Sequence, residues 1–214
     1  MNILIIGAAG SGKGTMSEKI VGKYHLPHIS TGDMFRQAIA EETPLGLEVK
    51  DYLDGGLLVP DKLTVSLVRE RIEKSDNGYL LDGFPRSLSQ AKALDEMTEI
   101  IKRPLDIVIN LVIDVSILAD RVVGRRICLN CGAIYNVTYS PPQTEGICDL
   151  CNSELIHRSD DTIENLATRL EIFETSIKPV IDYYRNLNLV VDIDAGQEIN
   201  AVWHDIESTL GKLK

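Results

Sequence analysis

Gly7-Ala8-Ala9-Gly10-Ser11-Gly12-Lys13 is the stretch, close to the start of the chain, that decides the fold. It fits the pattern Gly-x4-Gly-Lys, follows an apolar run at residues 2–6 and precedes helical spacing at residues 17–24. Glycines let the backbone curl so that successive N–H groups point inward and, with a helix N-terminus, hold phosphates. Lys13 then reaches the β- and γ-phosphates. The order strand, loop, lysine, helix predicts a nucleoside triphosphate site; the alternative is a chance glycine turn.

The rest of the chain alternates strand-like runs with helical stretches. This alternation predicts a doubly wound α/β fold with a parallel sheet. In the helical parts, Pro44 suits a first helical turn, Asp61 is expected to cap a helix, and Ser87 or Ser89 to open another. The expected strands are residues 79–81, 105–113 and 189–193, and the last expected helices are residues 115–123, 160–185 and 199–210.

Length, charge and hydropathy limit the possible classes of protein. The 214 residues, 44% of them hydrophobic, suffice for one sizeable core. The 32 acidic residues outnumber the 22 basic ones, which argues against a nucleic-acid coat or an anionic membrane surface as partner. No apolar run approaches the roughly 18 residues of a membrane span, and the N-terminus resembles a buried strand rather than a signal peptide. We therefore expect a cytoplasmic location, where cysteines stay reduced.

All four cysteines lie within a short segment of different character, residues 126–158. Cys128 and Cys131 form one Cys-x2-Cys pair, Cys148 and Cys151 form another, and 16 residues separate the pairs. Four thiolates at this spacing can surround one tetrahedral, structural Zn²⁺ ion. The alternative is four reduced thiols without metal. The segment has few apolar runs, so we expect a small inserted subdomain that cannot build a core of its own.

Three further segments combine with the loop ending Gly12-Lys13-Gly14-Thr15. They are Ser30-Thr31-Gly32-Asp33-Met34-Phe35-Arg36, Asp82-Gly83-Phe84-Pro85-Arg86 with Gln90, and Arg121-Val122-Val123-Gly124-Arg125-Arg126. In this order and spacing, over nearly the whole chain, the sequence closely resembles the adenylate kinase family, in its long-lid bacterial form. The resemblance implies a P-loop nucleoside-monophosphate kinase fold, a parallel sheet flanked by helices with two mobile inserted subdomains. The implied division is a core of residues 1–29, 60–124 and 162–214, an AMP-binding domain of residues 30–59, and a zinc-binding lid of residues 125–161.

The resemblance also implies the reaction and the residues that serve it. The reaction would be the reversible, Mg²⁺-dependent conversion of ATP and AMP to two ADP by a monomer, with neither nucleic acid nor membrane as partner. The ATP site would contain Gly10, Ser11, Gly12, Lys13, Gly14, Thr15, Arg121, Arg125, Ile134, Tyr135 and Gln197. The AMP site would contain Thr31, Arg36, Leu57, Leu58, Val59, Gly83, Phe84, Pro85, Arg86, Gln90, Arg158 and Arg169. The catalytic cations would be Lys13, Arg36, Arg86, Arg125, Arg158 and Arg169, while Asp33 and Asp82 would hold Mg²⁺ through its waters.

The chemistry of phosphoryl transfer calls for such parts independently of the resemblance. Negative charge spreads over the oxygens of the transferring group, so catalysis is mostly positioning and cationic clamping. Arginine suits this role because its planar fork is always charged and binds phosphate bidentately. Each residue has a simpler alternative, however. A lone arginine is often a solvated salt-bridge partner, Asp82 could be an acid at a helix N-terminus, and Thr31 a helix N-cap.

Some positions depart from the general patterns, and they leave two other functions to weigh. Gly14 stands where P-loops usually have Ser or Thr, and Ala9 where the family usually has proline. The guanine-reading Asn-Lys-x-Asp motif is absent, which argues against a switch GTPase. A second candidate is a UMP or CMP kinase of the same fold, which Thr31 and Gln90 disfavour. A third is a zinc-ribbon, nucleic-acid-dependent ATPase, which the acidic charge disfavours.

Overall fold

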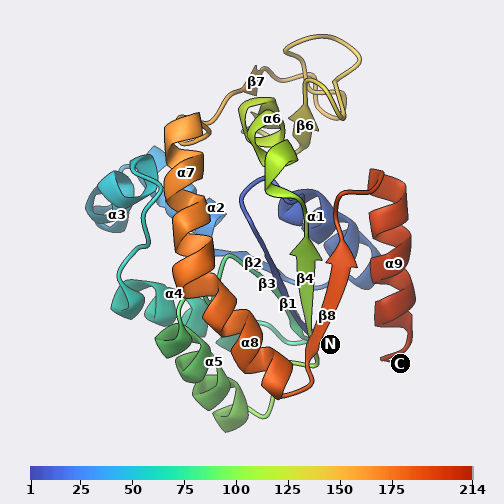
Figure 1. Cartoon of the computed structure of the whole chain (residues 1–214). Coiled ribbons are helices and arrows are strands. Elements are labelled where there is room, and N and C mark those ends of the chain that lie inside the picture. The colour runs from blue at the N-terminus through green and yellow to red at the C-terminus, as the bar shows by residue number, and fades with distance from the viewer. Residues whose placement is uncertain (214) are drawn as a thin grey trace.

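A five-stranded parallel sheet covered by helices on both faces forms the centre of the protein (Figure 1). The structure is a computed structural model and describes residues 1–213. The elements up to the middle of the chain are β1 (Asn2–Gly7), α1 (Lys13–Tyr24), β2 (His28–Ser30), α2 (Thr31–Ala40), α3 (Pro44–Asp54), α4 (Asp61–Glu73), β3 (Tyr79–Asp82), α5 (Leu88–Ile100) and β4 (Ile107–Val112). The remaining elements are the 3-10 turn η1 (Val115–Ile117), α6 (Leu118–Val123), β5 (Arg125–Cys128), β6 (Ile134–Asn136), β7 (Leu155–Ile156), α7 (Ile163–Ile172), the π-helical turn η2 (Phe173–Ile177), α8 (Lys178–Asn186), β8 (Val190–Asp194) and α9 (Ile199–Gly211).

The strand order is β2-β3-β1-β4-β8, and every neighbouring pair is parallel. β1 is fully buried because it lies in the middle and both of its faces are covered. Leu4 and Ile6 pack in one cluster with residues of α4, α5 and α8, whereas Ile3 and Ile5 pack in a second cluster with residues of α1 and α9. This alternation follows from the two-residue period of a strand. The predicted α/β fold is confirmed.

The strand order brings two of the predicted motifs together. The glycine loop leaves the C-terminal end of β1, and residues 82–86 begin at the C-terminal end of β3, the neighbour of β1. Ligands of open α/β sheets bind in the crevice outside these strand ends. The fold therefore places both motifs at one edge of the sheet.

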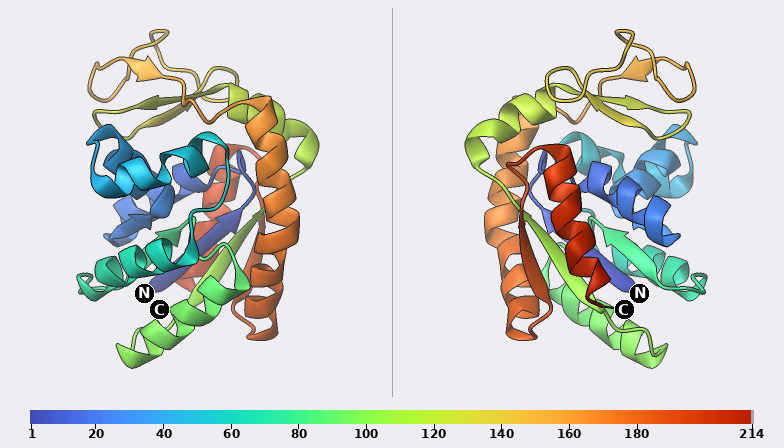
Figure 2. Two further views of the ribbon diagram at one scale, coloured as in Figure 1. Left: turned by 90° about the vertical axis from the view of Figure 1, so that its left-hand side faces the viewer. Right: turned by 90° about the vertical axis from the view of Figure 1, so that its right-hand side faces the viewer.

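Two insertions rise over this edge. One is the helix pair α2 and α3, and the other is a small antiparallel sheet of order β6-β5-β7 (Figure 2). Side chains bridge them directly: Arg36 Nη1 of α2 lies 3.6 Å from Asp160 Oδ2, and Arg158 Nη2 lies 3.5 Å from Asp33 Oδ1. Asn165 Nδ2 of α7 donates to the carbonyl oxygen of Asp54 at the end of α3, at 2.9 Å. The two insertions thus meet across the edge of the sheet.

The helix expected at residues 160–185 differs from the prediction in two ways. It begins at Ile163, with Thr162 as N-cap accepting from Asn165 N, and the π-helical turn η2 separates α7 from α8. Asp160 and Asp161 lie before the Thr162 N-cap, and their carboxylates pair with arginines. A similar correction applies to α4: its N-cap is Pro60, and Asp61 is its first helical residue.

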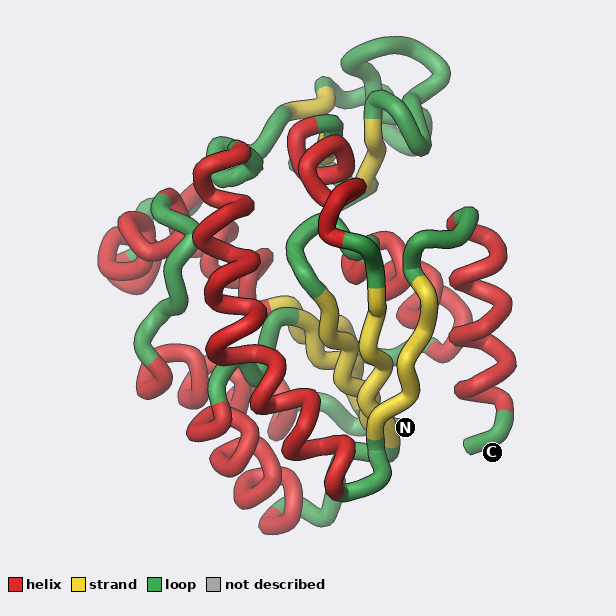
Figure 3. The backbone as a smooth tube through the Cα atoms, viewed as in Figure 1, coloured by secondary structure: helices red, strands yellow, loops and turns green. Residues whose placement is uncertain are grey.

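The tube in Figure 3 shows two regions that the sequence pattern did not reveal. The short edge strand β2 has only three residues, and the three strands of the smaller sheet have two to four residues each. Runs this short carry no readable alternation of apolar and polar residues.

Among the described residues, none of the helices is both long and apolar enough to cross a bilayer.

Candidate functional site

The glycine loop curls around the side chain of Lys13. Gly10 and Gly12 adopt φ values of 84° and 95°, in the left-handed region that favours glycine. Gly12 caps α1 without a side-chain hydrogen bond, so the first N–H groups of the helix are left for a ligand. Lys13 Nζ donates to the carbonyl oxygens of Gly7 and Ala8, at 2.7 and 2.9 Å. Burial lowers the pKa of Lys13 to about 8, although the Asp82 carboxylate opposes the shift.

One cleft of about 320 Å³ collects the loop and the segments that the sequence singled out. Seven cationic side chains line it, against three carboxylates, in a chain of net charge −10. The cleft is therefore a local site for anions. The sequence-predicted residues that line it are Gly10, Ser11, Gly12, Lys13, Gly14, Thr15, Thr31, Asp33, Arg36, Leu57, Leu58, Val59, Asp82, Gly83, Phe84, Pro85, Arg86, Gln90, Arg121, Arg125, Ile134, Tyr135, Arg158, Arg169 and Gln197.

Hydrogen bonds to the backbone hold the side of the cleft formed by α2 and the residues after β3. Arg86 Nε donates to the carbonyl oxygen of Gly83 at 2.7 Å, and Thr31 Oγ1 donates to the same oxygen at 2.8 Å. The backbone N–H of Arg86 donates to Gln90 Oε1 at 2.7 Å. Ser30, rather than Thr31, caps α2, because its hydroxyl accepts from the N–H of Asp33. Thr31 is thus free of the capping role considered above.

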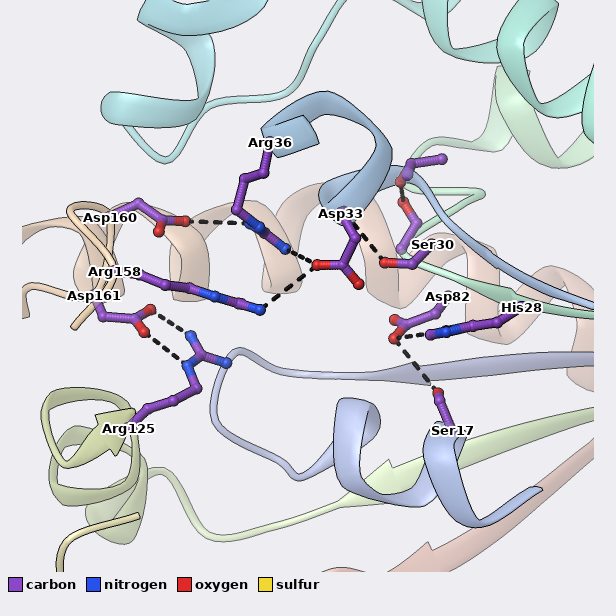
Figure 4. Close-up of polar contacts among 12 residues, drawn as sticks. Ser17, His28, Ser30, Asp33, Arg36, Asp82, Arg125, Arg158, Asp160 and Asp161 are labelled. Atoms are coloured by element: carbon purple, nitrogen blue, oxygen red, sulfur yellow. Dashed lines mark hydrogen bonds and ion pairs between the residues drawn. The ribbon is translucent and has the colours of Figure 1, made fainter. Parts of the chain in front are cut away.

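Two carboxylates that the sequence reading placed only in a helix turn out to organise the arginines (Figure 4). Asp161 is fully buried and accepts two hydrogen bonds from the guanidinium of Arg125, one of them from Nε at 2.7 Å. Asp160 accepts from Arg169 and lies 3.6 Å from Arg36. The sequence signal that could have indicated this role is the pair of adjacent acids that begins two residues after Arg158.

Asp33 and Asp82 lie in different electrostatic surroundings. Burial alone would raise the pKa of Asp33, but the guanidiniums of Arg36 and Arg158 and the hydroxyl of Ser30 lower it to about 2. Asp82 accepts a long hydrogen bond of 3.5 Å from Ser17 Oγ and lies 3.8 Å from His28 Nε2. Both carboxylates line the cleft. The contact between Asp82 and His28 was not predicted from the sequence.

Two polar atoms of the cleft are buried and have no hydrogen-bond partner among the residues that the structure describes. They are Ser11 Oγ in the glycine loop and Arg158 Nε. Burial and the neighbouring guanidiniums of Arg36 and Arg125 lower the pKa of Arg158 to about 10. Buried donors without partners are costly, and both atoms belong to residues that line the cleft.

The four cysteines converge in the smaller sheet, as the sequence predicted. Their Sγ atoms lie within 4.8 Å of one another, with Cys128 to Cys151 at 3.3 Å and Cys131 to Cys148 at 3.5 Å. Ligands at about 2.3 Å from a tetrahedral zinc ion would be roughly 3.8 Å apart. The group can therefore hold a metal ion. A small buried cluster surrounds it, made up of Cys128, Ala133, Tyr135, Cys148 and Leu155, so the apolar core here is slight, as expected.

The family model described as adenylate kinase matches residues 5–189. A protein of Bacillus pumilus named adenylate kinase is 47% identical over 215 residues, which cover 100% of this chain and 99% of that protein. Proteins of the same name from Bacillus subtilis and Clostridioides difficile are 47% and 48% identical over 216 residues, with 100% of each chain covered.

Proposed function

This chain belongs to the adenylate kinase family, and from that membership we propose which of its residues bind each nucleotide and transfer the phosphoryl group. The reaction is ATP + AMP = 2 ADP. With this family identified, neither a UMP or CMP kinase nor a nucleic-acid-dependent ATPase is adopted as the function. The observation that carries the assignment is the excess of seven cations over three carboxylates in one cleft that also contains the glycine loop.

The ATP site is proposed at the loop. Residues 10–15 surround the phosphates, and Lys13, already held over the loop by two carbonyl oxygens, contacts the outer phosphates. Arg121 and Arg125 bind the phosphates from the other side. Ile134 and Tyr135 of β6 lie above the loop, where a Cβ at Gly14 would come within 2.6 Å of the Ile134 side chain, so they suit the base and sugar. Gln197 completes this end of the cleft.

The AMP site is proposed on the opposite side of the cleft. Arg36 and Arg86 bind its phosphate. Thr31, Gln90, residues 57–59 and residues 83–85 surround its base and ribose, because they line the cleft between α2, the end of α3 and α5. Arg158 and Arg169 reach the same region from beyond β7 and from α7. Arg86 and Arg36 keep their geometry through hydrogen bonds, from Arg86 Nε to the carbonyl oxygen of Gly83 and from Arg36 Nη2 to Asp33 Oδ1.

Catalysis is proposed to rest on positioning and charge. Lys13, Arg36, Arg86, Arg125, Arg158 and Arg169 surround the transferring group and stabilise the charge on its oxygens. Asp160 and Asp161 hold three of these arginines in place. Asp33 and Asp82 suit Mg²⁺ bound through water, since Mg²⁺ keeps several waters in its shell and takes few carboxylates. Mg²⁺ would neutralise charge on the nucleotide phosphates.

We propose zinc as the metal held by Cys128, Cys131, Cys148 and Cys151. Four thiolates whose sulfur atoms lie within 4.8 Å of one another suit tetrahedral Zn²⁺ in a structural role. The division into a core, an AMP-binding domain (residues 30–59) and a lid (residues 125–161), with the last two moving, is proposed on the same family basis. A monomeric state and a cytoplasmic location stay predictions.

Formation of ADP from ATP and a nucleoside monophosphate tests the assignment. We expect AMP to be preferred over UMP, CMP and GMP by at least roughly tenfold in kcat/KM. Lys13→Met should lose most of the activity, because the cation at the loop is removed. A variant at an exposed cation far from the cleft, Lys74→Met, should match the wild type. Equal rates with all monophosphates would contradict the proposed AMP site.

A further inference from the structure

The carboxylate of Asp61 reaches across from the first turn of α4 to the first turn of α5. Its Oδ1 accepts from Gln90 Nε2 at 2.7 Å, and its Oδ2 accepts from Ser87 Oγ at 3.2 Å and from Ser89 Oγ. It does not cap its own helix, which begins after Pro60. Asp61 lies outside the lining of the cleft, whereas Gln90 belongs to it and is only 2% exposed.

Two partners with opposite hydrogen-bonding capacity fix the side-chain amide of Gln90. The backbone N–H of Arg86 can only donate, so the atom 2.7 Å from it is the amide oxygen. The Asp61 carboxylate can only accept, so the atom 2.7 Å from it is the amide nitrogen. A rotation of the amide by 180° would put oxygen against oxygen and N–H against N–H. The two ends of the amide are therefore locked.

The locked amide has one N–H and one lone pair left, since an amide has two of each. Adenine presents an amino donor beside a ring-nitrogen acceptor, which matches this pair. Hypoxanthine and guanine present the reverse pattern, a carbonyl oxygen beside a ring N–H. We propose that Asp61 is a specificity-determining positioning residue that keeps Gln90 in the orientation that accepts adenine and rejects 6-oxopurines. This inference rests on the proposed AMP site, in which Gln90 faces the base.

Kinetics with AMP and inosine monophosphate test it, because these nucleotides differ only at the edge that Gln90 would read. In Asp61→Ala we expect kcat/KM for AMP to fall about tenfold, as when a hydrogen bond to a charged group is lost. The value for inosine monophosphate should stay level or rise, because the amide can now turn. The KM for ATP should not change. Asp61→Asn keeps an acceptor oxygen and should restore most of the preference for AMP.

Two further variants separate the possible failures. Ser89→Ala removes a bond to the other carboxylate oxygen and should leave the AMP preference within about twofold of wild type. In a Gln90→Ala background, Asp61→Ala should have little additional effect on the preference. The positioning role is wrong if Asp61→Ala lowers kcat/KM equally for AMP and inosine monophosphate. It is also wrong if Asp61→Ala has the same effect in the Gln90→Ala background as in the wild type. If Gln90→Ala itself leaves the preference unchanged, the proposed placement of the base is wrong, and the inference falls with it.

Discussion

Arg125 and Arg169 share the buried carboxylate of Asp161, and this sharing shows how single residues set the chemistry of the cleft. Asp161 Oδ1 lies 3.5 Å from Arg169 Nη1 and also accepts from Arg125. Like-charged guanidiniums can converge on a phosphate only if something offsets their repulsion beforehand. A buried carboxylate beside them does so, and its two hydrogen bonds fix the plane of the Arg125 guanidinium, so that less reorganisation remains when an anion binds.

Replacing Asp161 by asparagine should cost more stability than an exposed acid would. Removing one partner of a buried ion pair typically costs about 3–5 kcal/mol, because a charge is left uncompensated. Thermal unfolding should therefore shift down by roughly 10 °C for a chain of this size. Asp182→Asn is the matched control, because Asp182 also pairs with an arginine but is 72% exposed. Equal shifts for both variants would contradict the role of Asp161.

Lys13 should give ATP binding an alkaline limit. Because burial lowers its pKa to about 8, the ammonium is charged below that pH and neutral above it. Its attraction for phosphate is present on the acid side and lost as the pH rises through 8. Calorimetric titration of ATP between pH 7 and 9.5 should show the affinity falling by roughly tenfold per pH unit at the top of this range. Lys13→Met should bind ATP weakly and should not show this fall in affinity at alkaline pH. If the variant shows the same fall, a group other than Lys13 is responsible for it.

At the scale of elements, the contact between α2 and α3 leaves no room for a side chain at Gly46. A Cβ there would lie 2.0 Å from the carbonyl oxygen of Ala38, which is backbone and cannot move aside cheaply. α2 carries Arg36, and α3 leads to residues 57–59. The geometry of the proposed AMP site thus depends on how closely these two helices approach.

Gly46→Ala should therefore weaken AMP use without affecting ATP. Overpacking of this kind costs about 1–3 kcal/mol, and here the strain would push α2 and α3 apart. We expect the KM for AMP to rise by roughly tenfold, while the KM for ATP stays within about twofold. Gly22→Ala is the control: it lies inside α1 with open space around it, and alanine there should raise helix stability slightly. A parallel loss for both substrates would contradict this assignment.

The predictability of each element followed from the strength of its local signal. The long strands and the order of motifs were predictable because apolar runs such as β1 and β4 are buried on both faces. Most residues that line the cleft were predictable because they sit in the quoted motifs, and the others, such as Arg158 and Gln197, followed only from the family resemblance. The roles of Asp61 and Asp161 were not, since their partners lie 29 and 36 residues away in the chain, and only the folded arrangement brings them together.

At the scale of the whole molecule, the lid should depend on its metal far more than the core does. The cluster around the cysteines is small, so a bound metal would supply most of the stabilisation; structural zinc contributes of the order of 10–16 kcal/mol in small metal-folded peptides. Purified protein should contain about one zinc per chain. Chelation should lower the temperature at which the lid unfolds in calorimetry, whereas binding of ATP at the glycine loop should persist. Protein without bound zinc, cobalt or iron, or a core that melts together with the lid, would contradict this.

The bridges between the two insertions have a consequence for thermodynamic linkage. Arg36 with Asp160 and Arg158 with Asp33 join α2 to the residues that follow β7, and Asn165 with Asp54 joins α7 to the end of α3. A nucleotide that binds better to this joined arrangement also orders the side chains that the second nucleotide contacts. The second nucleotide then loses less of its binding free energy to ordering them. By reciprocity, the factor by which ATP raises the affinity for AMP equals the factor by which AMP raises the affinity for ATP. The two nucleotides then bind with positive cooperativity, and neither of them alone reaches the affinity that it has when the other is bound.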